Sequence, residues 1–280
     1  MHIPPYDNQN KPIVDMNDSR VPLNYFNIVK LKRGDAFEYQ TPGYETCVVP
    51  ATGTIDVDVE GVAYSSIGLR TVDVWDAEPE GVYIPIGAKV SFVCTTDNAE
   101  VFIAGAPHDK VLDPFEIRAA DIDMVQYGSD DTKTHRKIKH ILGNKMHDRV
   151  GRLLVSELYT VGQGGWSGFP PHKHDTDRLP AETRHDETYN YRFRPNHGFG
   201  MQLVEREEGK VGDAYHLVES STIVLEDGYH PCVAAPGYEM YYFTILGGLS
   251  QRSLVQYFHP THAYQIEAIP GIKDMIAKFK

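Results

Sequence analysis

Short apolar runs with a period of two residues, separated by turn-forming residues, cover most of this 280-residue chain. In segment 55–60 (IDVDVE), apolar and acidic residues alternate, which is typical of a strand with one buried and one solvated face. Gly, Pro, Asp and Asn separate such runs at intervals of about ten residues, as in a β-sandwich or barrel. The sequence therefore predicts an all-β fold. Strands are predicted at 55–60, 71–75, 81–84, 90–95 and 100–104, and again at 152–160, 187–193, 200–205, 214–218, 222–225, 238–246 and 253–258.

The middle of the chain separates these two series of strands. From residue 119 to 146 the composition becomes polar and charged, and we place a domain boundary there, between residues 140 and 141. The basic run 134–140 (THRKIKH) has no aromatic residue beside it and is interpreted as a solvated linker. We predict two tandem barrels, residues 1–140 and 141–280, with a short amphipathic helix over 272–280 closing the chain.

Charge and cysteine content exclude several classes of protein. The formal net charge of −12 argues against a nucleic-acid partner, because such proteins concentrate Lys and Arg. No apolar run approaches the roughly 20 residues of a membrane helix, and the polar start is not that of a signal peptide. The three cysteines form no CxxC pair, so we predict neither a disulfide framework nor a zinc ribbon. A protein of the reducing cytoplasm, without a membrane partner, is expected.

Four residues of the second half form the pattern of a metal site. His172 and His174 are two residues apart in PPHKHD, and this spacing on a strand places both imidazoles on one face. Glu187 opens a predicted strand, and His230 lies in the turn DGYHP. An isolated HxH motif can also be two surface histidines in a loop, but the additional Glu and His favour one divalent ion. Three imidazoles and one carboxylate suit Zn²⁺, Mn²⁺, Fe²⁺ or Ni²⁺ rather than Ca²⁺ or Mg²⁺.

The two halves differ in histidine content. Between residues 20 and 130 the only histidine is His108, so the first barrel is predicted to be structural and to hold no comparable metal site. Tandem barrels of this kind expose edge strands, which favour association of identical chains. A homo-oligomer is therefore expected.

Longer motifs around the predicted ligands resemble a known family. They are GWSGFPPHKHD (165–175), ETYNYRF (187–193), HGFGMQ (197–202) and DGYHPCVAAPGYEMYY (227–242). These runs are similar to the bicupin family that contains the 5-deoxy-glucuronate isomerases of inositol catabolism and the 5-keto-4-deoxyuronate isomerases. The resemblance implies two cupin barrels, each a double-stranded β-helix or jelly roll. It also implies one divalent metal ion, with Zn²⁺ or Mn²⁺ favoured and Fe²⁺ and Ni²⁺ as alternatives, held by His172, His174, Glu187 and His230.

The activity implied by this resemblance is a metal-dependent aldose–ketose isomerisation of a small sugar acid. We expect conversion of 5-deoxy-glucuronate to 5-dehydro-2-deoxy-gluconate, by proton transfer through a metal-bound cis-enediolate. Glu182 and Tyr189 are the predicted catalytic residues, with His185 as a further candidate for the base. Arg binds carboxylates bidentately, and a uronate needs a cation. The predicted contacts to substrate hydroxyls and carboxylate are Tyr191, Gln202, Tyr242 and Arg252.

Other functions remain open at this point. Cupin barrels with three His and one Glu also serve as dioxygenases and as non-catalytic sugar-binding modules, so the fold alone decides nothing. The nearest alternative is the 5-keto-4-deoxyuronate isomerisation of pectin breakdown. Similarity beyond the ligands, in GFGMQ and CVAAPGYEMYY, favours the isomerase of inositol catabolism. The tyrosines can instead be packed wall residues, and Glu182 can be an exposed acid of a loop.

Overall fold

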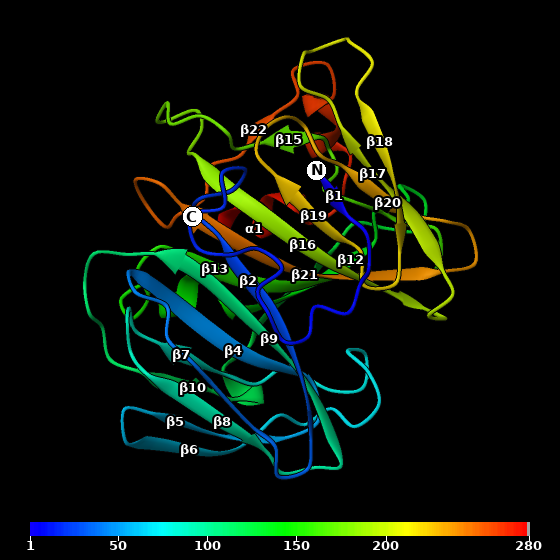
Figure 1. The fold of residues 1–280 in the computed structure, drawn as a ribbon. Coiled ribbons are helices and arrows are strands. Elements are labelled where there is room, and N and C mark those ends of the chain that lie inside the picture. Colours follow the sequence, from blue (N-terminus) through cyan, green and yellow to red (C-terminus); the bar gives the residue numbers. More distant parts are fainter. Residues whose placement is uncertain (279–280) are drawn as a thin grey trace.

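The computed structural model describes residues 1–278 and is almost entirely β, as the strand periodicity predicted (Figure 1). In the first half, a five-stranded sheet (order β10-β7-β4-β9-β2) faces a four-stranded sheet (order β3-β8-β5-β6). The bounds of these strands are β2 (Tyr25–Lys32), β3 (Ala36–Tyr39), β4 (Tyr44–Thr52), β5 (Ile55–Val59), β6 (Val62–Ile67), β7 (Gly81–Ile84), β8 (Val90–Cys94), β9 (Asn98–Pro107) and β10 (Phe115–Ile117).

The second barrel is built on a seven-stranded sheet of order β1-β19-β16-β21-β13-β12-β11. A four-stranded sheet (β14-β20-β17-β18) and the pair β15-β22 complete it. The strands are β1 (His2–Ile3), β11 (Asp123–Tyr127), β12 (Arg136–Leu142), β13 (Leu153–Thr160), β14 (Trp166–Ser167), β15 (His172–Lys173), β16 (His185–Arg194), β17 (Phe199–Val204), β18 (Asp213–Val218), β19 (Thr222–Leu225), β20 (Cys232–Ala234), β21 (Glu239–Gly248) and β22 (Tyr257–Phe258). The helical segments are η1 (Ala119–Asp121), η2 (Asn144–Met146), η3 (Ala263–Glu267) and α1 (Ile272–Ala277).

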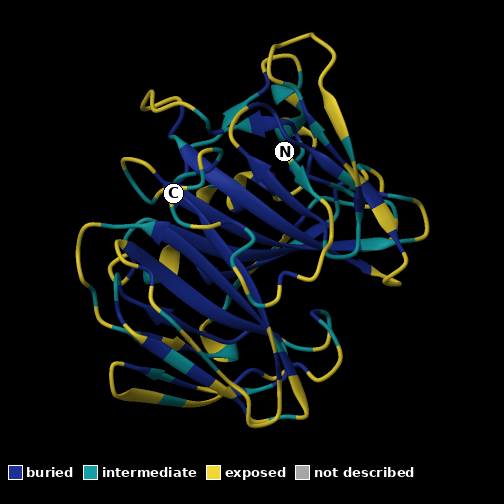
Figure 2. Ribbon diagram, viewed as in Figure 1, coloured by how far each residue is buried: buried dark blue, intermediate teal, exposed yellow. Residues whose placement is uncertain are grey.

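Both barrels contain strands with period-two burial, such as β5 and β17, and strands that are buried almost continuously, such as β4 and β16. Along β5, Ile55, Val57 and Val59 are buried, while the intervening acids face outward. Strand β16 instead buries every residue except its last, because both of its faces are covered. Figure 2 shows buried residues along the central strands of both barrels and in the layer between them, whereas outer strands such as β6 and β18 carry exposed residues. One of the predicted metal ligands, Glu187, lies on the continuously buried strand β16.

One apolar cluster joins the two barrels. Phe102 of β9 lies 4.8 Å, ring to ring, from Phe243 of β21, and Phe26 of β2 stacks on the same ring. Buried polar contacts cross the same layer. Both oxygens of Glu45 in β4 accept hydrogen bonds from backbone amides of residues 151–153 at 2.5–2.8 Å. The barrels are therefore docked through a continuous core rather than connected by a flexible linker.

The interpretation of 134–140 as a solvated linker is wrong. These residues lead into β12, which pairs with β11 on one side and β13 on the other. The predicted boundary between residues 140 and 141 falls inside this strand. Arg136 and Lys139 are buried, because Arg136 reaches tyrosine hydroxyls and the Lys139 ammonium lies 3.1 Å from Glu78. Because of its basic composition, a segment that forms a core strand was interpreted as a linker.

Several element predictions also need correction. Residues 71–75 form a turn instead of a strand, because the Asp76 carboxylate accepts hydrogen bonds from the amides of Thr71 and Val72. Of the predicted strand 253–258, only Tyr257–Phe258 pairs. The closing helix is confirmed over Ile272–Ala277, and the end of its predicted range lies outside the described residues. No helix within residues 1–278 has the length and apolar character needed to span a membrane.

Candidate metal centre

Three buried histidines converge at one end of the second barrel. His172 lies on β15, His174 directly follows that strand, and His230 lies in the turn before β20. One ring nitrogen from each histidine lies within 4.8 Å of the other two. All three side chains are at least nine-tenths buried. The HxH spacing and the distant turn histidine therefore meet as the sequence predicted, and this group can bind a metal ion.

Backbone carbonyls fix the orientation of each imidazole. The Nδ1 atoms of His172, His174 and His230 lie 3.1, 2.9 and 2.8 Å from the carbonyl oxygens of Pro170, His185 and Gly228, respectively. A carbonyl oxygen can only accept, so each Nδ1 carries the proton. Each Nε2 is then left to act as a metal ligand, and a hydrogen bond of this kind is the usual support of a metal-binding histidine.

Glu187, at the third position of β16, completes the cluster. Its Oε2 lies 3.1 Å from His174 Nε2 and 3.3 Å from His230 Nε2, while its Oε1 accepts a hydrogen bond from Thr244 at 2.8 Å. Ligands about 2.0–2.1 Å from a tetrahedral ion are separated from one another by roughly 3.3 Å. The buried Nε2 of His230 has no hydrogen-bond partner within residues 1–278. Three imidazoles and one carboxylate thus fit a single divalent metal.

The pKa shifts of these residues are those expected if Glu187 is a buried anion whose charge is compensated by neighbouring imidazoles. Burial alone raises the pKa of a carboxyl, but the neighbouring imidazoles of His174 and His230 hold the pKa of Glu187 well below its usual value. Burial opposes the charged form of His174, yet Glu187 outweighs burial and raises the pKa of His174. Burial, with the neighbouring His230 and His174, keeps the pKa of His172 well below its usual value.

The cluster opens into a pocket inside the second barrel. Around His172, His174 and Glu187 the pocket has polar lining from six more side chains, whereas the rest of the lining is largely apolar. The polar residues are Tyr127, Arg136, Tyr189, Tyr242, Thr244 and Gln256. The apolar residues include Leu158, Phe169, Leu246, Leu254 and Phe258.

Tyr189 lies in this pocket, as its predicted catalytic role requires. Its ring is 4.5 Å from that of Tyr242 and 6.3 Å from that of His230. Within residues 1–278, its hydroxyl makes no hydrogen bond to another protein group. Burial, followed by the charge of Glu187, raises the pKa of Tyr189 well above its ordinary value. The phenol is therefore protonated at neutral pH and can donate a hydrogen bond into the pocket.

The other predicted catalytic residue, Glu182, lies outside the pocket lining. Its buried carboxylate accepts hydrogen bonds from the amides of Asp175 and Thr176, and it forms an ion pair with Arg178 at 2.7 Å. These contacts fix the loop that leads from His174 to β16. A base role for Glu182 is not favoured by this geometry, because both carboxylate oxygens are already engaged.

Of the four residues predicted to contact the substrate, one lines the pocket and the other three lie outside its lining. Tyr242 lines the pocket, and its hydroxyl lies 2.5 Å from Ser167 Oγ. Tyr191 donates to Gln202, whose amide in turn donates to the carbonyl of His230 at 2.7 Å, so this pair supports the His230 turn. Arg252 donates to backbone carbonyls of Leu142, Gly143 and Leu153. These contacts leave the guanidinium of Arg252 outside the pocket and do not favour carboxylate binding by it.

Sequence reasoning missed four polar residues of the pocket, Tyr127, Arg136, Thr244 and Gln256. Arg136 lies in the run taken for a linker, where Ile138, Ile141 and Leu142 were the signal of a buried strand. Gln256 lies where a strand was predicted, with its Nε2 2.9 Å from His172 Nε2, and its buried Oε1 has no hydrogen-bond partner among residues 1–278. No spacing rule pointed to Gln256.

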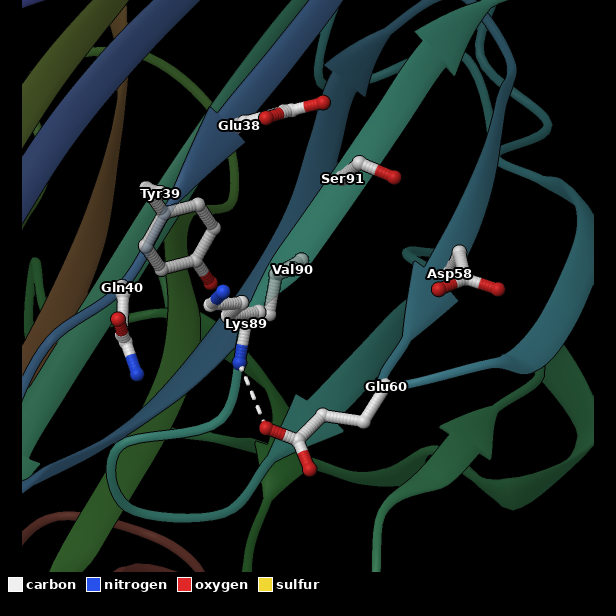
Figure 3. Close-up of a pocket in the computed structure, with 8 residues that line it drawn as sticks. All are labelled: Glu38, Tyr39, Gln40, Asp58, Glu60, Lys89, Val90 and Ser91. Atoms are coloured by element: carbon white, nitrogen blue, oxygen red, sulfur yellow. Dashed lines mark hydrogen bonds between the residues drawn. The ribbon is translucent and has the colours of Figure 1, made fainter.

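A second hollow lies on the outer face of the first barrel (Figure 3). Its lining includes the side chains of Glu38, Asp58 and Glu60, and the carboxylate of Glu60 accepts a hydrogen bond from the amide of Lys89. The acids come from strands β3 and β5 and from the turn after β5, and none of the eight residues drawn is a histidine or cysteine. Such a group of acids is consistent with a solvated face, and we assign no site to it.

Comparisons with known proteins agree with this picture. A 5-deoxy-glucuronate isomerase from Listeria monocytogenes is 31% identical over 260 residues, covering 91% of this chain and 92% of that protein. The crystal structure of an IolB-like protein from Salmonella typhimurium matches with a TM-score of 0.80 and 26% identity, covering 86% of this chain and 89% of that one. These relatives confirm the predicted enzyme class, an isomerase.

More distant structures support the fold alone. The oxalate decarboxylase of Lactobacillus farciminis superposes with a TM-score of 0.60 at 9% identity, over 92% of this chain and 87% of that one. The predicted all-β, cupin-like architecture is thereby confirmed. The family model of the KduI/IolB family matches residues 2–265. This match covers nearly the whole chain, and with the relatives above it shows that the chain belongs to the KduI/IolB family.

Proposed function

We propose that the protein converts 5-deoxy-glucuronate to 5-dehydro-2-deoxy-gluconate in inositol catabolism, with one divalent metal at the histidine cluster. The observation that carries this proposal is the convergence of three oriented imidazoles and Glu187 on a pocket that also contains hydroxyl and guanidinium groups. The activity for which the Listeria relative is named supports this substrate. The extension of similarity over most of both chains supports it further.

His172, His174, Glu187 and His230 would hold the metal, and the donor set favours Zn²⁺ or Mn²⁺. When bound, such an ion supplies a Lewis acid that polarises the substrate carbonyl and stabilises developing negative charge. The remaining chemistry consists of two proton transfers, one from C2 to C1 and one from the C2 hydroxyl to the C1 oxygen. The C1 aldehyde thereby becomes a hydroxyl group and the C2 hydroxyl becomes a ketone. Side chains of the protein must orient the sugar and transfer these protons.

Tyr189 is the residue best placed to act on a substrate oxygen. Its protonated hydroxyl faces the pocket and can donate to the oxygen on which charge develops, so we assign it as a proton donor rather than as the base. Leu158, Leu246 and Phe258 give the same space an apolar wall. An environment of low polarity strengthens each of these electrostatic contacts.

We also propose that the first barrel is a scaffold. Strands β2 to β10 supply the docking layer and the Glu45 contacts to residues 151–153, which lead into β13 and include its first residue. Strand β13 pairs with β21, and β21 carries Tyr242 and Thr244 of the pocket. On this proposal the division between barrels lies before β11, because β11 and β12 belong to the seven-stranded sheet.

The function is tested by assaying the purified full-length protein on two sugar acids. Conversion of 5-deoxy-glucuronate at a kcat/KM far above that for 5-keto-4-deoxyuronate is expected. Preference for 5-keto-4-deoxyuronate, or oxygen uptake stoichiometric with substrate loss, would overturn the proposal. In D₂O, deuterium is expected at the carbon that was C1, since proton transfer through a protein group exchanges with solvent.

Replacing Tyr189 with phenylalanine is expected to lower kcat by roughly 10²–10⁴-fold while metal content stays unchanged, because one proton donor is lost. Steady-state kinetics and elemental analysis of the same preparation measure the two quantities. Tyr215→Phe is the control, because that hydroxyl bonds to Asp213 on β18, outside the pocket lining. A Tyr189→Phe protein with wild-type kcat would remove Tyr189 from the mechanism.

A further inference from the structure

Arg136 is a buried cation inside the pocket of the metal cluster. Its side chain is almost fully buried and lines the pocket together with His172, His174 and Glu187. Its Nη1 donates to the hydroxyl of Tyr127 at 2.7 Å, and its Nη2 donates to the hydroxyl of Tyr242 at 2.9 Å. Its Nε is buried and has no hydrogen-bond partner within residues 1–278.

The environment of Arg136 differs from that of the other fully buried arginines. Arg70 is held bidentately by Glu157 at 2.6 and 2.7 Å, and Arg192 lies 2.6 Å from Glu100. Arg136, by contrast, has only neutral hydroxyl acceptors and forms no ion pair within the part of the chain that the structure describes. A buried charge without an opposite charge is unfavourable, so it points to an anionic partner that binds from outside.

The position of Arg136 suits one end of a sugar acid. Tyr242, which accepts the Arg136 hydrogen bond, contacts Tyr189, and Tyr189 contacts the ring of His230. The guanidinium and the metal-binding histidines are thus separated by two aromatic rings across one pocket. A ligand with a carbonyl at one end and a carboxylate at the other can place its carbonyl at the histidine cluster and its carboxylate at the guanidinium of Arg136.

We infer that Arg136 binds the carboxylate of the sugar-acid substrate. This inference rests on the proposed function for the identity of the substrate, but the carboxylate preference itself is independent of turnover. Arg136 takes the role that the sequence had assigned to Arg252. Its planar fork of donors matches a carboxylate, and its unpartnered Nε supplies a donor that the protein leaves unused.

The test compares two probes, D-glucuronate and D-glucuronamide. In D-glucuronamide a neutral amide of similar size replaces the carboxylate. Their dissociation constants are measured by calorimetry on the full-length protein as purified, and again after removal of metal with a chelator. The second measurement separates binding at Arg136 from binding of the carboxylate to an ion. The wild-type protein is expected to prefer glucuronate by about tenfold or more in both states. Arg136→Met is expected to abolish this preference and to leave metal content unchanged.

Two variants keep the result interpretable. Lys137→Met removes a cation from the same strand, but Lys137 lies over the ring of Tyr159 and not in the pocket, so the preference should persist. Arg136→Lys keeps the charge and loses the fork, so an intermediate preference is expected even if the Met variant does not fold. Equal affinity of the wild-type protein for both probes, or an unchanged preference in either Arg136 variant, would overturn the inference. Absence of isomerisation with the charge preference intact would instead overturn only the proposed function.

Discussion

Replacing His230 with alanine is expected to remove most of the bound metal and to lower isomerase activity by roughly three orders of magnitude. Binding of a structural Zn²⁺ by four ligands contributes about 10–16 kcal/mol, so one lost ligand removes several kcal/mol, and each 1.36 kcal/mol is tenfold. His230 is buried, its Nδ1 is anchored on Gly228, and its Nε2 faces Glu187. Elemental analysis of protein purified without added metal, with kinetics on the same sample, measures both effects.

His216→Ala is the matched control, because that histidine is exposed on β18 and lies outside the cluster. It should retain wild-type metal content and activity. A His230→Ala protein with full metal occupancy would mean that the cluster is not the metal site. Loss of metal without loss of activity would separate the ion from the reaction.

The second large effect is expected on stability, at the ion pair that joins the two barrels. Arg70 and Glu157 are both fully buried and bonded bidentately, and the hydroxyls of Tyr159 and Tyr241 donate to the same carboxylate. Glu157→Gln leaves the Arg70 guanidinium buried without its counter-ion. The free energy of unfolding should fall by about 3–5 kcal/mol, as measured by urea denaturation followed by tryptophan fluorescence.

Two further variants distinguish the effect of leaving a buried charge unpaired from the effect of losing a single contact. Glu116→Gln breaks a half-exposed pair with Arg118 and should change stability by about 1 kcal/mol or less. The double variant Arg70→Met/Glu157→Leu should lose less than Glu157→Gln alone, because no unpaired charge remains. A Glu157→Gln protein within about 1 kcal/mol of wild type would contradict the assignment.

The pH dependence has a definite sign. Burial opposes ionisation of Glu157, but Arg70 outweighs it and lowers the pKa of this carboxyl below the ordinary 4.5. The stability that Glu157 contributes is therefore present above the pKa of the unfolded chain, and is lost as the pH falls through the lower pKa of the folded protein. In wild type, part of the acid-induced loss of stability below about pH 4.5 should disappear in Glu157→Gln.

The sequence by itself determined the features that follow from local pattern. Alternation of apolar and polar residues predicted the all-β fold, since side chains of a strand alternate between its faces. The HxH spacing, the Glu at the start of a strand and the turn histidine predicted the four residues that the structure brings together. These residues could be identified from local pattern because each lies at a position whose backbone geometry is local: a strand pair, a strand start and a turn.

Only the tertiary structure decided which charged residues face the pocket. From the sequence, Glu182 was interpreted as an acid and Arg252 as a cation that are available to the substrate. In the structure both side chains are bonded to other protein groups, which no spacing rule reveals. Arg136 read as part of a solvated run, yet it is buried because hydroxyls of Tyr127 and Tyr242, the latter 106 residues away, accept its donors. The free energy of burying a charge depends on partners supplied by other strands, and a sequence pattern does not contain those partners until the sheets have assembled.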